Sequence, residues 1–190
     1  MLLGACAASN SSRAPARIEI QEAVGFTITE DTNASLDMRT SYEEGVRLLE
    51  QGQQQQGIRV LQDVTVQAPD LVTPYIDLGI ALHRAGDLEA AEESLLKARA
   101  LNPEHPVVHN ELGIIYRKTG RFAEARDSYE AALAIYPNYH YTRRNLAVLC
   151  DLYLADQNCA LENYEVYMNT VPGDAEASMW VADLRNRMGQ

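Results

Sequence analysis

The chain is short of the residues that several large protein classes depend on. Its 190 residues contain 16 Lys and Arg against 27 Asp and Glu, which gives a formal net charge of −11. Because nucleic-acid binding needs surplus cations to neutralise phosphates, this charge balance argues against a nucleic-acid partner. No apolar run approaches the ~20 residues that a membrane-spanning helix requires.

The sequence has few prolines, which break helices, and it lacks the common catalytic motifs. The sequence has 7 prolines, 2 phenylalanines and 1 tryptophan, and its hydrophobic share of 46% is typical of a folded globular protein. Its many Ala, Leu, Glu and Arg residues favour helix. The sequence lacks a phosphate-binding glycine loop, G-x-S-x-G, H-E-x-x-H and C-x-x-C. We therefore predict a non-enzymatic protein with no cofactor and no metal site.

What the sequence does contain is an internal repeat. Two columns of glycine and one of proline recur with a period of 34 residues: Gly45, Gly79 and Gly113; Gly52, Gly86 and Gly120; and Pro69, Pro103 and Pro137. Several columns with one period indicate a repeat architecture. The predicted units are residues 38–71, 72–105 and 106–139, followed by a fourth unit at 140–174 that is one residue longer.

Each unit has the pattern of two helices. In the third unit, apolar residues at helical spacing end at Gly120, and a second helical run ends before Pro137. Gly113 and Ala125 are small, so the two helices can approach closely. Each helical hairpin leaves one apolar face uncovered, which the next hairpin buries in a solenoid.

The units resemble the tetratricopeptide repeat, whose pattern is W-x₂-L-G-x₂-Y, then A-x₃-F, then P. The second and third units carry the best matches: Tyr75, Leu78, Gly79, Leu82, Ala91, Leu95, Ala98 and Pro103; and His109, Leu112, Gly113, Tyr116, Ala125, Tyr129, Ala132 and Pro137. In the first unit Glu44 replaces the leucine. The resemblance implies an all-α, right-handed superhelical solenoid of four repeats over residues 38–174, with a capping helix at 175–190.

By resemblance to this family, function resides in a concave groove lined by the first helix of each unit. A protein partner would bind there through a peptide segment or a helix. The residues predicted to bind the partner are Tyr42, Val46, Ile76, Ile80, His83, Asn110, Ile114, Arg117, Lys118, Tyr141, Arg144 and Val148. The ninth position of every unit is apolar, which predicts a continuous apolar stripe.

Charge is uneven along the chain, and the third unit is neutral whereas the other three units are acidic. We expect Arg117, Lys118 and Arg121 to lie near Arg143 and Arg144. A basic cluster on an acidic protein suggests an acidic peptide or a C-terminal carboxylate as the ligand.

The first 37 residues do not follow the repeat. Residues 7–17 have the composition of a flexible linker. Over residues 18–30 apolar and polar residues alternate, which predicts a strand with a bulge or kink at Gly25. Such a strand would lie along the solenoid, pair with a partner's sheet edge, or stay unordered.

The start of the chain, Leu3-Gly4-Ala5-Cys6, resembles the bacterial lipobox. In that family the cysteine is acylated and becomes the new N-terminus, and Ala7 would favour sorting to the outer membrane. Five residues before Cys6 are fewer than a signal peptide needs, so this hypothesis expects a start upstream of Met1. The alternative is a chance match in an alanine-rich segment.

The remaining cysteines, Cys150 and Cys159, lie in the two predicted helices of the fourth unit, about equally far from the turn. They can face each other in an antiparallel hairpin. A disulfide between them would fit an oxidising periplasm. The alternative is two free cysteines in the core.

These observations predict a non-catalytic scaffold for envelope assembly of the pilus or secretion type, lipid-anchored to a bacterial outer membrane and facing the periplasm. One alternative is a cytoplasmic repeat adaptor or co-chaperone-like protein that begins at Met1. Another is a metal-dependent regulator that acts through His83, His109 and His140.

Overall fold

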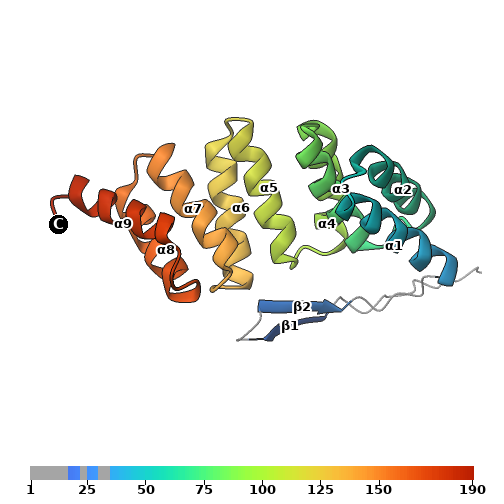
Figure 1. Cartoon of the computed structure of the whole chain (residues 1–190), viewed down its shortest axis with the longest axis horizontal. Helices are drawn as coiled ribbons and strands as arrows, with labels where there is room; N and C mark the ends of the chain where they lie inside the picture. Colours follow the sequence, from blue (N-terminus) through green and yellow to red (C-terminus); the bar gives the residue numbers. More distant parts are fainter. Residues whose placement is uncertain (1–16, 22–24, 30–34) are drawn as a thin grey trace, which may run out of the picture. The chain divides into compact units, whose positions relative to one another are not determined.

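A computed structural model describes residues 17–21, 25–29 and 35–190 of the chain. The chain divides into two compact units, residues 1–33 and 34–190, and each is described by itself. The second unit contains all the helices of the described residues (Figure 1). None of those helices has both the length and the apolar character needed to cross a membrane.

The N-terminal unit contains a short antiparallel hairpin. Strand β1 (Arg17–Gln21) pairs with strand β2 (Gly25–Thr29), so that Arg17 lies opposite Thr29 and Gln21 opposite Gly25. This corrects the prediction of one strand over residues 18–30. The alternating pattern belongs to two strands, and each satisfies the backbone hydrogen-bonding groups of the other.

The second unit is a stack of helical hairpins that follow one another in sequence order (Figure 1). The described helices are α1 (Leu36–Glu50), α2 (Gln54–Gln67), α3 (Val72–Ala85), α4 (Leu88–Leu101), α5 (Pro106–Lys118), α6 (Phe122–Ile135), α7 (His140–Leu152), α8 (Gln157–Thr170) and α9 (Ala175–Arg187). Each predicted 34-residue unit holds two of them, and the fold is the expected helical repeat solenoid.

Within a hairpin, a glycine of the first helix lies against a large side chain of the second. A Cβ on Gly113 would come 2.4 Å from Cε1 of Tyr129, and one on Gly79 would come 2.7 Å from Cγ of Leu95. Leu95 and Tyr129 are fully buried. The small residue at this position lets the second helix approach until its large residue fills the space between the helices.

The turn between paired helices uses the left-handed backbone region. Gly52, Gly86 and Gly120 have φ angles of 77°, 87° and 77°. In the fourth repeat, which has the extra residue, Ala155 adopts φ 54° in this turn. A non-glycine residue in this region costs about 1 kcal/mol or more, so the fourth turn is the strained one.

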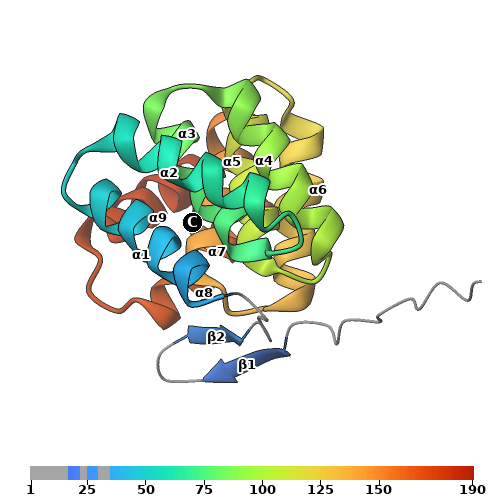
Figure 2. The same cartoon turned by 90° about the vertical axis from the view of Figure 1, so that its right-hand side faces the viewer.

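Neighbouring hairpins meet mainly where the second helix of one packs against the first helix of the next, and the first helices also contact one another. Helices α1, α3, α5 and α7 contact one another in series, whereas the second helices contact only first helices. Figure 2, which looks at one end of the stack, shows the hairpins following one another in depth. The first helices therefore form one continuous face, which we call the inner face.

Helix α9 repeats the burial pattern of a first helix. Val181 and Leu184 are buried, as are Leu146 and Leu149 of α7 at the same positions counted from the helix start. The ring of Trp180 packs 5.6 Å from that of Tyr164 in the fourth repeat. This is the packing expected of a cap.

A disulfide joins Cys150 of α7 to Cys159 of α8 and spans the strained turn. Cys150 is fully buried, at the position taken by Tyr116 in the third repeat. The covalent link therefore fastens the two helices of the fourth hairpin on both sides of its turn.

We expect Gly113→Ala to lower the free energy of unfolding by about 1–3 kcal/mol, because the new methyl group overlaps the buried Tyr129 ring. Urea unfolding followed by circular dichroism measures the change. The matched control makes Gly113→Ala in a Tyr129→Ala background, where the overlapping ring is absent and the added methyl group should cost less stability than in the wild type. A Gly113→Ala protein as stable as the wild type would contradict this account of the packing.

We expect reduction of the disulfide to destabilise the chain by about 2–3 kcal/mol, because a short closed loop in the unfolded state is released. The measurement is thermal unfolding with and without a reductant, and mass spectrometry counts the free thiols. Cys159→Ser should unfold at the lower temperature under both conditions. If reductant lowered the transition of Cys159→Ser as much as that of the wild type, the pairing would be wrong.

Candidate functional site on the inner face

The predicted apolar stripe lies on the inner face. Val46, Ile80, Ile114 and Val148 occupy the same position on α1, α3, α5 and α7, and all four side chains are half-buried. Since these helices contact one another in series, the four side chains follow each other along the stack. Such a row can accept the apolar side of a peptide.

Polar contacts cross the inner face between α1, α3 and α5. The Tyr42 hydroxyl donates to Oδ2 of Asp77, which links α1 to α3. Nδ1 of His83 lies 3.9 Å from Oε2 of Glu111, which links α3 to α5. The side chains of His83 and Glu111 are each 15% exposed, so this pair forms part of the floor of the face.

These titratable groups have shifted pKa values. Burial raises the pKa of Asp77, and the hydrogen bond from Tyr42 partly offsets this effect. Burial also raises the pKa of Glu111, against the hydrogen bond from Asn110. The pKa of His83 is lowered by burial and by the positive charges of nearby Lys118, Arg84 and Arg117. The imidazole is therefore mostly neutral at pH 7, and its contact with Glu111 is not a full ion pair.

Asn110 is a structural bridge rather than free groove surface. Its Oδ1 accepts hydrogen bonds from Thr142 Oγ1 and Asn145 Nδ2, both at 3.0 Å, and its Nδ2 donates to Glu111. It is 2% exposed. Ile76 is also buried, at 5%. The sequence predicts both residues to bind the partner, and the structure corrects this because they are enclosed within the stack.

The predicted basic cluster is divided. Arg121 pairs with Glu92 on α4, and Arg143 donates to Asn163 on α8. Both arginines thus fasten neighbouring helices and do not join Lys118 on the inner face. The cations that remain together are at the C-terminal ends of α3 and α5, where Arg84, Arg117 and Lys118 surround His83.

Arg144 connects α7 to α9. Its guanidinium lies 3.5 Å from a carboxylate oxygen of Glu176 and 5.1 Å from the centre of the Trp180 ring. Asp151 and Arg187 form a second ion pair between these helices, at 2.8 Å. Arg144 therefore holds the last helix in place, and its charge is already shared with an acid.

Three well-exposed apolar side chains lie on α7 and α9. Tyr141 is 60% exposed, Leu152 69% and Met179 65%. Tyr141 is among the residues that the sequence predicts, but Leu152 and Met179 are not. Leu152 could have been predicted from the repeat register, because it occupies the position of Arg84 and Lys118 in the preceding repeats. Exposed apolar side chains such as these can contact a protein partner.

The three histidines proposed for a metal do not gather. Within the described residues, the group of three or more potential ligands that lies close together is Cys150, Asp156 and Cys159, and its cysteines form the disulfide. Cys6 lies outside the described residues, so the structure does not address its proposed lipidation.

A comparison with protein families matches the tetratricopeptide repeat model twice, over residues 42–106 and 76–140. Together these matches cover more than half of the sequence. The chain belongs to the tetratricopeptide repeat family. Proteins of this fold act as scaffolds that bind other proteins, which agrees with an inner face rich in exposed apolar groups.

Solved structures share the fold of this tetratricopeptide repeat protein. MamA 41-end from Desulfovibrio magneticus RS-1 is 19% identical, with a TM-score of 0.72 over 82% of this chain and 87% of that one. PilF of Pseudomonas aeruginosa is 20% identical, with a TM-score of 0.71 over 80% and 68%. TTC0263, a tetratricopeptide repeat protein of Thermus thermophilus, is 24% identical, with a TM-score of 0.66 over 78% and 81%. At these identities the likeness concerns the fold alone.

A curated relative is matched over a shorter stretch. Anaphase-promoting complex subunit 6 of Dictyostelium discoideum is 37% identical over 62 residues. The match covers 33% of this chain and 7% of that protein. It therefore supports the repeat and says nothing of the relative's whole function.

Proposed function

We propose that this tetratricopeptide repeat protein is a non-catalytic scaffold that holds a peptide segment or helix of a protein partner on its inner face. The observation that carries the proposal is the set of exposed apolar side chains on α7 and α9, Tyr141, Leu152 and Met179. The half-buried stripe of Ile114 and Val148 continues this surface across α5 and α7. Together they offer a partner apolar contact over several repeats.

The cations on α3 and α5 determine which kind of ligand the inner face prefers. Arg84 and Lys118 are exposed at the ends of these helices, and the guanidinium of Arg117 lies 5.9 Å from the centre of the Tyr153 ring. Positive charge beside an apolar stripe favours a segment with both apolar residues and carboxylates. The proposed ligand is thus an acidic, partly apolar peptide.

We also propose that the chain is a bacterial lipoprotein, anchored through Cys6 to the outer membrane and facing the periplasm. The lipobox-like Leu3-Gly4-Ala5-Cys6 and the Ala- and Ser-rich segment after it support this proposal. A lipid anchor needs a tether between the membrane and the folded domain. A disulfide in the fourth repeat fits an oxidising compartment.

For the inner face, we expect a photo-cross-linker at position 152 to give a discrete protein adduct in the cell that naturally makes the chain. Lys118→Glu should reduce that adduct at least severalfold, because it reverses a charge on the same face. The control cross-linker is placed at Asp127, which is exposed on α6. Equal adducts from both positions, or an adduct that Lys118→Glu does not change, would reject the inner face as the binding site.

For the anchor, we expect intact-mass spectrometry of protein made from the natural gene to show an acylated Cys6 as the first residue. Cys6→Ser should move the protein from the membrane fraction to the soluble fraction, because a lipid chain is the proposed membrane contact. An unmodified chain that begins at Met1 would support the cytoplasmic adaptor instead.

A further inference from the structure

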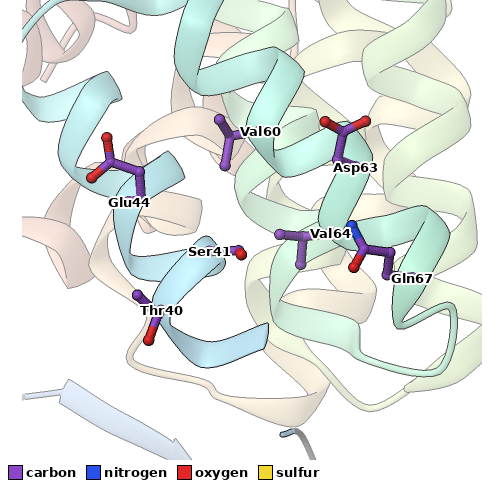
Figure 3. A pocket seen from close by; sticks show the side chains of 7 residues that line it. All are labelled: Thr40, Ser41, Glu44, Val60, Asp63, Val64 and Gln67. Atoms are coloured by element: carbon purple, nitrogen blue, oxygen red, sulfur yellow. The ribbon is translucent and has the colours of Figure 1, made fainter. Parts of the chain in front are cut away.

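The first repeat has a hollow on the side that faces away from the rest of the stack. It measures about 420 Å³ and lies between α1 and α2. We call it the end seat, and its lining residues are Thr40, Ser41, Glu44, Val60, Asp63, Val64 and Gln67. Figure 3 shows Ser41 of α1 and Val60 and Val64 of α2 around the middle of this hollow, with Glu44 and Asp63 on its two sides.

The repeat register shows what normally covers such a surface. Thr40 and Glu44 correspond, 34 residues on, to Pro74 and Leu78, which are both buried. That surface of the second repeat packs against α2, the second helix of the hairpin before it. Thr40 is exposed and Glu44 is half-buried, and no helix of the described residues covers them. The end seat thus lies where the second helix of a preceding hairpin would pack.

In the later repeats, a polar contact joins the first helix to the C-terminal end of the second helix that packs against it. The fourth residue of each later repeat bonds to a backbone carbonyl near the end of the preceding second helix: Tyr75 to Thr65 O at 3.3 Å, His109 to Pro103 O at 2.7 Å and Arg143 to Pro137 O at 2.9 Å. In the first repeat this position is Ser41, which is exposed in the end seat. Its hydroxyl can donate to the C-terminal carbonyls of a helix bound there.

The negative charge of the end seat favours a helix that carries basic residues. Glu44 and Asp63 line it, and none of the seven lining residues is a cation. Arg47, one turn further along α1, forms an ion pair with Glu44 at 2.6 Å. Asp63 therefore carries the negative charge that is available to an incoming ligand. Val60, which is half-buried, supplies apolar surface above the buried Val64. A basic residue near the C-terminal end of an incoming helix would meet Asp63, and it would also suit the negative end of the helix dipole.

We propose that the end seat binds an amphipathic helix of a protein partner that carries Lys or Arg near its C-terminal end. The helix would lie against α1 as α2, α4 and α6 lie against the first helices of the repeats that follow them, and it would also meet the α2 side of the hollow. This surface is separate from the inner face, so the scaffold would hold two ligands of opposite charge at two places.

The chain itself supplies a probe of this chemistry. A fluorescent peptide with the sequence of residues 87–105 contains α4, with Lys97 and Arg99 near its C-terminal end. By fluorescence anisotropy we expect it to bind the full chain, and Glu44→Lys/Asp63→Lys should weaken binding at least tenfold. The control variant Glu89→Lys/Glu93→Lys makes the same charge change at exposed positions on α4 and should leave the affinity unchanged. A peptide with Lys97→Glu and Arg99→Glu should bind at least tenfold more weakly.

Circular dichroism confirms that each variant is folded before binding is compared. Equal affinity for the two protein variants, or for the two peptides, would overturn the proposal. A photo-cross-linker at position 41 should capture the peptide. Cross-links to residues 1–34 or to a second copy of the chain instead would also overturn it, because another occupant would then fill the end seat. The cross-link from position 152 on the inner face should not change in Glu44→Lys/Asp63→Lys, which separates this test from that of the proposed function.

Discussion

The close contact between a small residue on one helix and a large residue on its partner determines the rest of this structure. At Gly79 and Gly113 no side chain larger than hydrogen fits, because the buried side chains of Leu95 and Tyr129 fill the space. This contact brings the two helices of a hairpin together at one depth and one angle. Since it recurs every 34 residues, each hairpin presents nearly the same surfaces to the next, and the hairpins stack in register.

The regular alignment of successive hairpins in turn creates the inner face. Identical positions on α3, α5 and α7 come side by side through contacts between residues one repeat apart, so an apolar ninth residue in every repeat becomes a stripe. The same arrangement places Asp77 beneath Tyr42 and Glu111 beside His83. The inner face is therefore a product of hairpin packing, and its polar contacts tie one repeat to the next.

The repeat could be predicted from the sequence because it is local and periodic. A helix ends at Gly86 or Gly120 for reasons contained within a few residues, and the period then transfers that end to the other units. Contacts that depend on three-dimensional neighbours could not be predicted in this way. Asn110 has the position of a groove residue, but Thr142 and Asn145 of the next repeat enclose it. The alternation over residues 18–30 indicates extended backbone and contains no information about the partner of a strand.

A stack of repeats also has ends, and there the same positions meet a different environment. Leu78 and its equivalents are apolar because a preceding second helix covers them, whereas Glu44 takes that position where no helix of the described residues does so. A carboxylate there can reach water and leaves the packing of Gly45 against Leu61 inside the hairpin unaltered. Its departure from the repeat pattern thus follows from its place in the stack. The same reasoning accounts for the acidic character of the end seat, since Glu44 and Asp63 lie where no helix of the described residues has to be matched by an apolar surface.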